Sequence, residues 1–318
     1  MIFNLAGTDQ LLLSVLYAFL LALFVTPISI YFAQKTNLID VPNSQPHKLH
    51  HHPVPIAGGI ALFTTILLSI SLLHHEFSMM TVRVMIPAAM VFGVGLWDDY
   101  RPLRPIDKAI GQVIATVVMI LLGVQVHIFE SLLPTEGIWW WVVFTLDIGT
   151  TLFWMVFVIN AVNLIDSSDG LAIGVSNNTM IFCILLALDT QQWAIAYIAG
   201  IILGTGIVLH LFNTSPAKLF LGDSGALLIG YFLGVIAILY NPPAKEQAST
   251  WFVPILMLGI PIFDSVLVIY ARWRRKAQFY NGGTDHTFHR LVRLGLSPSQ
   301  AVSLINLVTV GLQIFALY

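Results

Sequence analysis

The sequence predicts an all-α integral membrane protein, a bundle of about ten transmembrane helices that forms one polytopic domain over residues 1–318. Three observations support this prediction. Hydrophobic residues make up 57% of the chain and charged residues only 9%, and the mean hydropathy of +0.85 lies far outside the range of soluble domains. Apolar runs long enough to cross a bilayer recur along the whole chain. Basic residues concentrate in alternate interruptions between these runs, as they do in multi-pass proteins.

The apolar runs define the expected helices. Each can cross roughly 30 Å of hydrocarbon, and they cover residues 10–33, 56–73, 82–97, 108–126, 142–162, 170–188, 193–212, 222–240, 251–272 and 299–318. No lysine or arginine precedes Lys35, so the first run lacks the basic start of a cleaved signal peptide. We therefore expect it to be a retained span.

The charge distribution predicts the orientation. One side of the membrane receives the interruptions 34–55, 98–107, 163–169, 213–221 and 273–298, and the other receives 74–81, 127–141, 189–192 and 241–250. Of the 14 lysines and arginines, all except Arg83 and Lys245 lie in or beside the first set. Because basic residues accumulate in cytoplasmic loops, the first set is expected to be cytoplasmic and both termini to lie outside. The plasma (inner) membrane is the expected location.

Composition excludes several classes of function. The net charge is −2 and the pI about 6.5, so there is no basic field to attract nucleic acid, and no nucleic-acid-binding motif is present. The single cysteine, Cys183, permits neither a disulfide framework nor a thiolate metal site. Any bound metal must therefore take oxygen or nitrogen ligands.

Side chains that can bind metal or phosphate gather on the predicted cytoplasmic side. Carboxylates at membrane depth are costly and are usually retained for a task. Each of the five inner interruptions or its margin carries candidates: Asp40 with His47, His50, His51 and His52; Asp98 and Asp99; Asp166 and Asp169; Asp223; and Asp264, Asp285, His286 and His289. The outer interruptions hold scattered acids, and we expect no cluster there.

Asp98 and Asp99 end an apolar run and precede Arg101 and Arg104. Successive helical residues point about 100° apart, so the two carboxylates cannot present identically to one ligand. One is expected to face a cleft and the other a basic or backbone partner. The alternative is a solvated pair balanced by the two arginines.

The segment 160–170, Asn-Ala-Val-Asn-Leu-Ile-Asp-Ser-Ser-Asp-Gly, places a polar break between two spans. If it stays helical, Asn163 and Asp166 share a face, as do Asp166 and Asp169. A simple helix N-cap at Ser168 or Asp169 is the alternative, but it explains one residue and not four.

The segment 213–225 leads into the eighth run. It begins with Asn213 and contains Lys218, a point charge suited to a phosphate. Glycines on both sides of Asp223 allow a ligand to approach the backbone closely. An ordinary N-cap is the alternative for Asp223, favoured by the helix dipole.

Three candidates lie near the C-terminus. Asp264 falls inside an apolar span, where a charge needs a water-filled cleft or a cation. His286 and His289 are three residues apart and can share a helical face, with surface histidines as the alternative. The histidine tract 50–52 is not expected to form a specific metal site.

Acidic residues beside lysine and arginine on one membrane face suit a magnesium-bound diphosphate. Hard oxygen ligands hold the ion, while basic groups contact the remaining phosphate oxygens. Phosphoryl transfer mostly requires alignment and charge neutralisation, which a metal bridging the diphosphate supplies. Because the site would lie at the rim of a membrane bundle, the acceptor is expected to be a lipid.

Six segments in order resemble the polyprenyl-phosphate N-acetylhexosamine-1-phosphate transferases, the superfamily that also contains the phospho-N-acetylmuramoyl-pentapeptide transferases. The resemblance spans nearly the whole chain. It rests on 40–43 with 53–59, the Asp98-Asp99 pair, 160–170, 220–225, 261–264, and His286 with His289.

The resemblance implies that a polyprenyl phosphate such as undecaprenyl phosphate attacks the β-phosphate of a UDP-sugar and releases UMP, the first membrane step of a cell-envelope glycan such as lipopolysaccharide or teichoic acid. It implies magnesium as cofactor, with manganese as the alternative ion. Asn163 and Asp223 resemble the metal-site residues, and Asp98 and Asp99 resemble the catalytic pair. The implied substrate-binding residues are Asp166, Asp169, Asn213, Lys218, Asp264, His286 and His289.

Two departures from the family pattern concern the loops. Phe288 stands where relatives often have a third histidine, and Gln45-Pro46-His47-Lys48 replaces a common arginine-lysine pair. The last loop also lacks the three consecutive histidines of the muramoyl-pentapeptide branch, which favours UDP-N-acetylglucosamine as the donor. That branch stays open as an alternative, as do an aspartate-rich prenyltransferase and an ion-coupled transporter. The oligomeric state is open, with a homodimer as one alternative.

Overall fold

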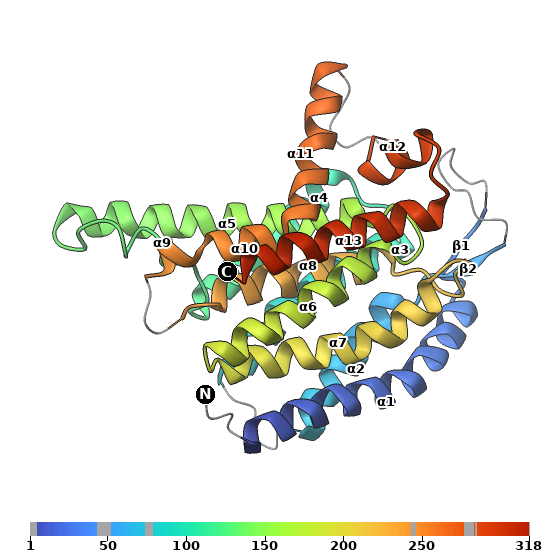
Figure 1. Ribbon diagram of the computed structural model, residues 1–318, viewed down its shortest axis with the longest axis horizontal. Coiled ribbons are helices and arrows are strands. Elements are labelled where there is room, and N and C mark those ends of the chain that lie inside the picture. The colour runs from blue at the N-terminus through green and yellow to red at the C-terminus, as the bar shows by residue number, and fades with distance from the viewer. Residues whose placement is uncertain are drawn as a thin grey trace.

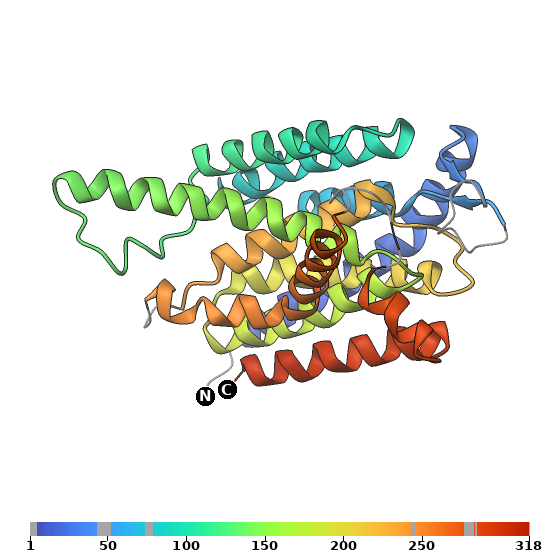
Figure 2. The same cartoon turned by 90° about the horizontal axis from the view of Figure 1, so that it is seen from above.

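The computed structural model describes residues 5–42, 52–73, 79–242, 246–276, 283 and 285–317. Within these ranges the regular secondary structure is helical apart from two strands of two residues each, and most of the long helices lie side by side in one bundle (Figures 1 and 2). His47, His50 and His51 of the first predicted loop lie outside the described residues.

The helices follow the predicted apolar runs in order, except for two short helices, 247–250 and 287–293, which lie in predicted interruptions. They are α1 (Leu5–Lys35), α2 (Gly58–Leu73), α3 (Met79–Tyr100), α4 (Pro105–Leu121), α5 (Ile138–Ile165), α6 (Leu171–Asp189), α7 (Trp193–Asn213), α8 (Gly222–Leu239), α9 (Gln247–Thr250), α10 (Phe252–Met257), α11 (Gly259–Arg274), α12 (Thr287–Arg293) and α13 (Pro298–Ala316). The strands β1 (Ile39–Asp40) and β2 (Val54–Pro55) pair antiparallel.

Seven of the described helices are long and apolar enough to cross a bilayer, namely α1, α3, α5, α6, α7, α8 and α13. A further span is broken, because Gln247–Met257 and Gly259–Arg274 meet at 74°. The apolar helices α2 and α4 are shorter, with 16 and 17 residues. The chain is therefore an all-helical, multi-pass membrane protein with seven or eight candidate spans among its described residues, which confirms the predicted class but only part of the predicted number.

The run 251–272 does not form the single straight helix that its hydropathy predicts. Pro261 lacks the N–H that would bond the carbonyl of Met257, and its ring clashes with that carbonyl, so the helix breaks between the two residues. The Met257 carbonyl instead accepts a hydrogen bond from Gln313 Nε2 at 3.2 Å. After the break, α11 leaves the bundle at a steep angle (Figure 1).

The helix α8 forms the centre of the bundle. Every residue from 224 to 238 is buried, and the helix packs against α2, α3 and α5. Peripheral helices instead turn apolar residues outward. On α1 the exposed side chains recur every fourth residue, at Leu12, Leu16, Leu20, Phe24 and Ile28, which is the pattern of a lipid-facing stripe.

Small residues and a strand bring separate segments to the start of α8. A Cβ added to Gly95 of α3 would lie 2.5 Å from the Cα of Ser224, and one added to Gly59 of α2 would overlap the Ser224 side chain. Close helix approach through glycine is typical of membrane bundles. The segment after β2 also pairs with the segment just before α8, through a parallel bridge between Ile56 and Phe220.

Candidate active site

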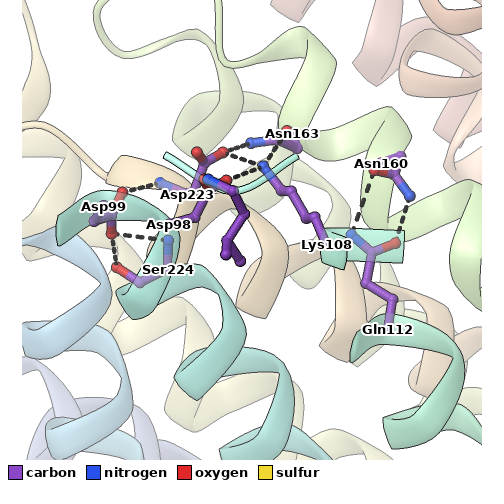
Figure 3. A network of polar contacts seen from close by, with 9 residues as sticks. Asp98, Asp99, Lys108, Gln112, Asn160, Asn163, Asp223 and Ser224 are labelled. Atoms are coloured by element: carbon purple, nitrogen blue, oxygen red, sulfur yellow. Dashed lines mark hydrogen bonds and ion pairs between the residues drawn. The ribbon is translucent and has the colours of Figure 1, made fainter. Parts of the chain in front are cut away.

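Polar side chains from α3, α4, α5 and α8 meet at one end of the bundle, around Asp223 (Figure 3). Asp223 Oδ1 accepts hydrogen bonds from Lys108 Nζ and from Asn163 Nδ2, each at 2.6 Å. Lys108 Nζ also lies 3.0 Å from Asp98 Oδ2 and 3.3 Å from Asn163 Oδ1. The ammonium is therefore surrounded by oxygen atoms from three residues on three helices.

The adjacent carboxylates Asp98 and Asp99 point to different partners, as their helical spacing predicts. Asp98 faces Lys108 and also accepts the backbone N–H of Leu103 at 2.7 Å. Asp99 accepts the backbone N–H groups of Asp223 at 2.7 Å and of Ser224 at 3.0 Å, as well as the Ser224 hydroxyl. Asp99 thus caps the N-terminus of α8, where the helix dipole favours a negative charge.

The capping contact requires glycine at position 222. Gly222 has φ +68, a backbone conformation that side chains disfavour, and a Cβ there would lie 2.7 Å from both Asp99 oxygens. The pattern Gly222-Asp223 therefore does two things at once. It turns the chain into α8, and it lets the Asp99 carboxylate reach the first amides of that helix.

A neutral pair next to the cluster joins α4 to α5. Asn160 Nδ2 donates to Gln112 Oε1 at 2.6 Å, and Gln112 Nε2 donates to Asn160 Oδ1 at 3.4 Å (Figure 3). Gln112 is one helical turn beyond Lys108, and Asn160 is nearly one turn before Asn163. The contact between Gln112 and Asn160 therefore fixes the register in which Lys108 and Asn163 meet Asp223.

The loop between α5 and α6 adds further carboxylates. Burial raises the pKa of Asp166 to about 7, and the charges of Asp223, Asp169 and Asp99 raise it further. Asn213 holds this loop in place, because its Oδ1 accepts the N–H of Gly170 at 3.0 Å and its Nδ2 donates to the Leu219 carbonyl at 3.0 Å. The amide of Asn213 is buried, so it links two loops at the same end of the bundle.

Asp264 of α11 binds the start of α12. Its carboxylate is 1% exposed, lies 2.8 Å from His286 Nδ1 and accepts the N–H of Thr287 at 2.6 Å. The ring centroids of His286 and His289 are 6.2 Å apart. Phe288, at the departure from the family pattern, is buried.

A second set of charges fastens the same loop to α11. Asp285 forms ion pairs with the guanidinium groups of Arg272 and Arg275. Burial alone would raise the pKa of Asp285, but the hydrogen bond from Arg275 and the charges of Arg272 and Arg290 lower it below its usual value. The histidines are thus held against α11 by acid–base contacts on both sides.

Two residues that the sequence interpretation passed over belong to the cluster, and one that it included lies outside. Lys108 was counted only among the basic residues of the cytoplasmic side, and Gln112 was expected only as part of an apolar run. Their spacing of four residues, which places both on one face of α4, is the signal that identifies them. Lys218 is exposed, and no hydrogen bond or ion pair joins its ammonium to the other described residues.

The oxygen atoms around the Lys108 ammonium have the chemistry of a magnesium site. Carboxylates of Asp98 and Asp223 and the amide oxygen of Asn163 are hard ligands, and all three already contact one positive group. The donor set therefore fits a divalent cation of the magnesium class. Such an ion would compete with the ammonium for the same oxygens.

The sequence of residues 81–241, which contains most of this cluster, matches the family model described as glycosyl transferase family 4. The match covers half of the chain and includes Asp98, Lys108, Asn163 and Asp223. The chain belongs to glycosyl transferase family 4. Membership in this family confirms the expected resemblance and the class of enzyme, a membrane transferase, and sets aside the prenyltransferase and the transporter.

The chain is similar to several curated relatives. It is 28% identical to the probable undecaprenyl-phosphate N-acetylglucosaminyl 1-phosphate transferase of Bacillus subtilis, over 94% of this chain and 83% of that protein. It is 27% identical to the decaprenyl-phosphate N-acetylglucosaminephosphotransferase of Mycobacterium leprae, over 94% and 81%. It is 28% identical to the undecaprenyl-phosphate alpha-N-acetylglucosaminyl 1-phosphate transferase of Escherichia coli, over 86% and 74%.

Proposed function

We propose that this enzyme transfers N-acetylglucosamine 1-phosphate from UDP-N-acetylglucosamine to a polyprenyl phosphate of the undecaprenyl class and releases UMP. The observation that carries the proposal is the convergence of Asp98, Lys108, Asn163 and Asp223 at one end of a membrane bundle. The names of the similar proteins point to the same donor sugar and the same kind of acceptor.

The proposed reaction exchanges one phosphoanhydride bond for another. An oxygen of the acceptor phosphate forms a bond to the β-phosphorus of the UDP-sugar, and the bond from that phosphorus to the bridging oxygen of UMP breaks. Catalysis of such a transfer depends on alignment and charge neutralisation. Lys108 is suited to the phosphate oxygens, because its ammonium is a compact point charge already held at the site.

Magnesium is the proposed cofactor. Asp223 and Asn163, with Asp98 beside them, would hold the ion, which when bound would neutralise charge on the diphosphate. Asp98 is the better placed of the adjacent pair to meet an acceptor phosphate, whereas Asp99 serves α8. We assign Asp166, Asp169, Asp264, His286 and His289 to the nucleotide-sugar side of the site, and Asn213 to positioning the loop that carries Asp169.

The orientation is also part of the proposal. The basic residues predict that the end of the bundle bearing Asp223 faces the cytoplasm, where UDP-sugars are made, and that the protein lies in the plasma membrane. Reporter fusions after residues 101 and 189 test this orientation. A cytoplasmic signal at 101 and an external one at 189 support it, and the reverse pair of signals contradicts it.

Incubation of the purified enzyme with radiolabelled UDP-N-acetylglucosamine, undecaprenyl phosphate and magnesium tests the function. A labelled lipid together with stoichiometric UMP is the expected result. UDP-N-acetylmuramoyl-pentapeptide in place of the first donor is the control for the muramoyl-pentapeptide branch. Labelled lipid from that donor alone would overturn the choice of sugar, and no lipid product from either would overturn the reaction.

A further inference from the structure

A second cluster of metal-ligating side chains lies far from the candidate active site. His127 and Glu130 follow α4, and Asp147 lies on α5, 16 residues before Asn163 and so roughly 24 Å away along the helix. The sequence predicts no cluster in the outer interruptions, whereas the structure brings two residues of the interruption 127–141 together with Asp147 of the run 142–162. The cluster is assembled by a loop and a helix, which explains why spacing alone does not reveal it.

The three side chains offer one nitrogen and two carboxylate groups to a common point. His127 Nδ1 lies 2.6 Å from Glu130 Oε2, and one ligand atom from each of His127, Glu130 and Asp147 lies within 4.8 Å of the other two. A metal ion bound to all three would draw these atoms closer together. His127 and Glu130 contact each other and are both exposed, so their side chains have room to make that adjustment.

Asp147 is oriented as ligating carboxylates are. Its Oδ1 accepts the N–H of Phe129 at 2.9 Å and its Oδ2 accepts the N–H of Glu130 at 3.3 Å. Hydrogen bonds of this kind to a ligating carboxylate fix its direction and leave further lone pairs for an ion. Asp147 is only 2% exposed, whereas the side chains of His127 and Glu130 are 48% and 55% exposed.

The backbone that leads into His127 is fixed by two hydrogen bonds. Val126 N–H donates to Thr151 Oγ1 at 3.0 Å, and His127 N–H donates to Gln247 Oε1 at 2.6 Å. Gln247 is itself held by the Ile238 carbonyl at 3.0 Å. These contacts come from α5, α8 and α9 and not from the cluster, so the loop is arranged before any ion arrives.

We propose that His127, Glu130 and Asp147 form a binding site for a divalent transition-metal ion, with zinc as the ion of best fit. A nitrogen and two carboxylate oxygens with room for water match the zinc coordination pattern, whereas magnesium and calcium favour oxygen alone. The ion would also offset the repulsion between the carboxylates of Glu130 and Asp147, whose ligand oxygens lie within 4.8 Å of each other. Its role would be to fasten the loop before α5 onto that helix, independently of the transferase reaction.

The test compares zinc binding by the purified full chain in detergent after treatment with a chelator. His127→Ala and Glu130→Gln remove one ligand each, and Glu136→Gln, an exposed acid of the same loop outside the cluster, is the matched control. The wild type and Glu136→Gln are expected to retain about one zinc ion more per chain than the two ligand variants. Zinc should raise the Tm of the wild type and of Glu136→Gln by about 2 °C or more. It should leave the Tm of His127→Ala and of Glu130→Gln unchanged.

Zinc could also bind near Asp223, and repeating the titration in an Asp223→Asn background distinguishes that binding from binding at the proposed site. In this background Glu136→Gln should still bind more zinc than His127→Ala. Equal zinc binding by the wild type and by both ligand variants would overturn the site. Transferase activity with magnesium, measured on the same preparations, should be the same in His127→Ala and Glu136→Gln. A failure of zinc binding thus stays distinct from a failure of the proposed reaction.

Discussion

Lys108 of α4 forms an ion pair with Asp223 at the start of α8, with 2.6 Å between Nζ and Oδ1. The same ammonium lies 3.0 Å from Asp98 Oδ2, so one positive charge serves two carboxylates from different helices. This arrangement makes the charge balance of the site depend on few groups. Changes to either member of the pair should therefore be separable by their effects on turnover and on stability.

Asp223→Asn should reduce turnover by more than the roughly 10–100-fold that loss of an outer metal partner costs. The amide keeps the shape of the side chain but removes the charge proposed to hold the ion, while Lys108 retains Asp98. Membrane insertion and Tm should change little by comparison. Radiolabelled product formation and fluorescence-detected size exclusion measure the two effects, and wild-type-like rates would remove Asp223 from the metal site.

Lys108→Met should destabilise the magnesium-free protein by about 1–3 kcal/mol, less than the 3–5 kcal/mol of a fully buried pair, because the site is partly exposed. Magnesium should then raise the Tm more in this variant than in the wild type, since the uncompensated carboxylates bind the cation without a competitor. Lys218→Met, which removes an exposed lysine, is the matched control. A magnesium response equal in all three proteins contradicts the shared binding of ammonium and cation.

The adjacent aspartates should respond differently to the same change. Asp99→Asn turns one acceptor of the α8 amides into a donor and should cost about 1–3 kcal/mol of stability. Asp98→Asn keeps the capping contact intact and should mainly lower turnover. Thermal unfolding and initial rates on both variants check the assignment, which is refuted if Asp98→Asn is the less stable protein of the two.

The contact between Gln112 and Asn160 should appear as a coupling energy. In a double-mutant cycle with Gln112→Leu and Asn160→Leu, we expect about 0.6 kcal/mol and at most about 1.7 kcal/mol, the range of side-chain hydrogen bonds in membrane bundles. Denaturant titration in mixed micelles measures the four free energies of unfolding. Strict additivity would show that the pair does not hold α4 and α5 in register.

The raised pKa of Asp166 predicts a pH dependence of stability in the magnesium-free protein. A carboxyl with a pKa of about 7 in the folded state and 3.8 as its model value binds its proton more tightly when folded. The resulting stabilisation is fully present below pH 3.8 and is lost as the pH rises through about 7. The Tm should therefore fall across this window through this group, and Asp166→Asn should flatten that part of the profile.

Hydropathy predicted where most of the long helices lie, because each segment that crosses the bilayer must be apolar and must satisfy its own backbone hydrogen bonds. It could not predict the break at Met257, which depends on Pro261 and on a side chain, Gln313, more than 50 residues later in the chain. The different directions of Asp98 and Asp99 followed from helix geometry alone. That Asp99 would bind the start of α8 did not, since the contact spans 124 residues.

The sequence singled out Asn163 and Asp223 because each interrupts apolar sequence, and the structure brings these two side chains together. Lys108 was not predicted as a site residue. It lies at the edge of an apolar run, where a lysine is counted as a cytoplasmic loop charge under the positive-inside rule. Lys218 was included for the same chemistry and proved exposed. Sequence shows which side chains are unusual, but only packing shows toward which neighbours they turn.

Four backbone hydrogen bonds join Pro55, Ala57, Gly58 and Gly59 to the dipeptide Phe220-Leu221, immediately before the α8 turn. The stretch 81–241 that matches the family model is therefore held in part by backbone contacts with residues 55–59, which lie outside it. A fragment of residues 81–241 alone would lose these hydrogen bonds, which hold the chain in place immediately before Gly222. Co-expression of residues 1–80 with residues 81–318 is the arrangement in which a protein split at that border should regain its assembly.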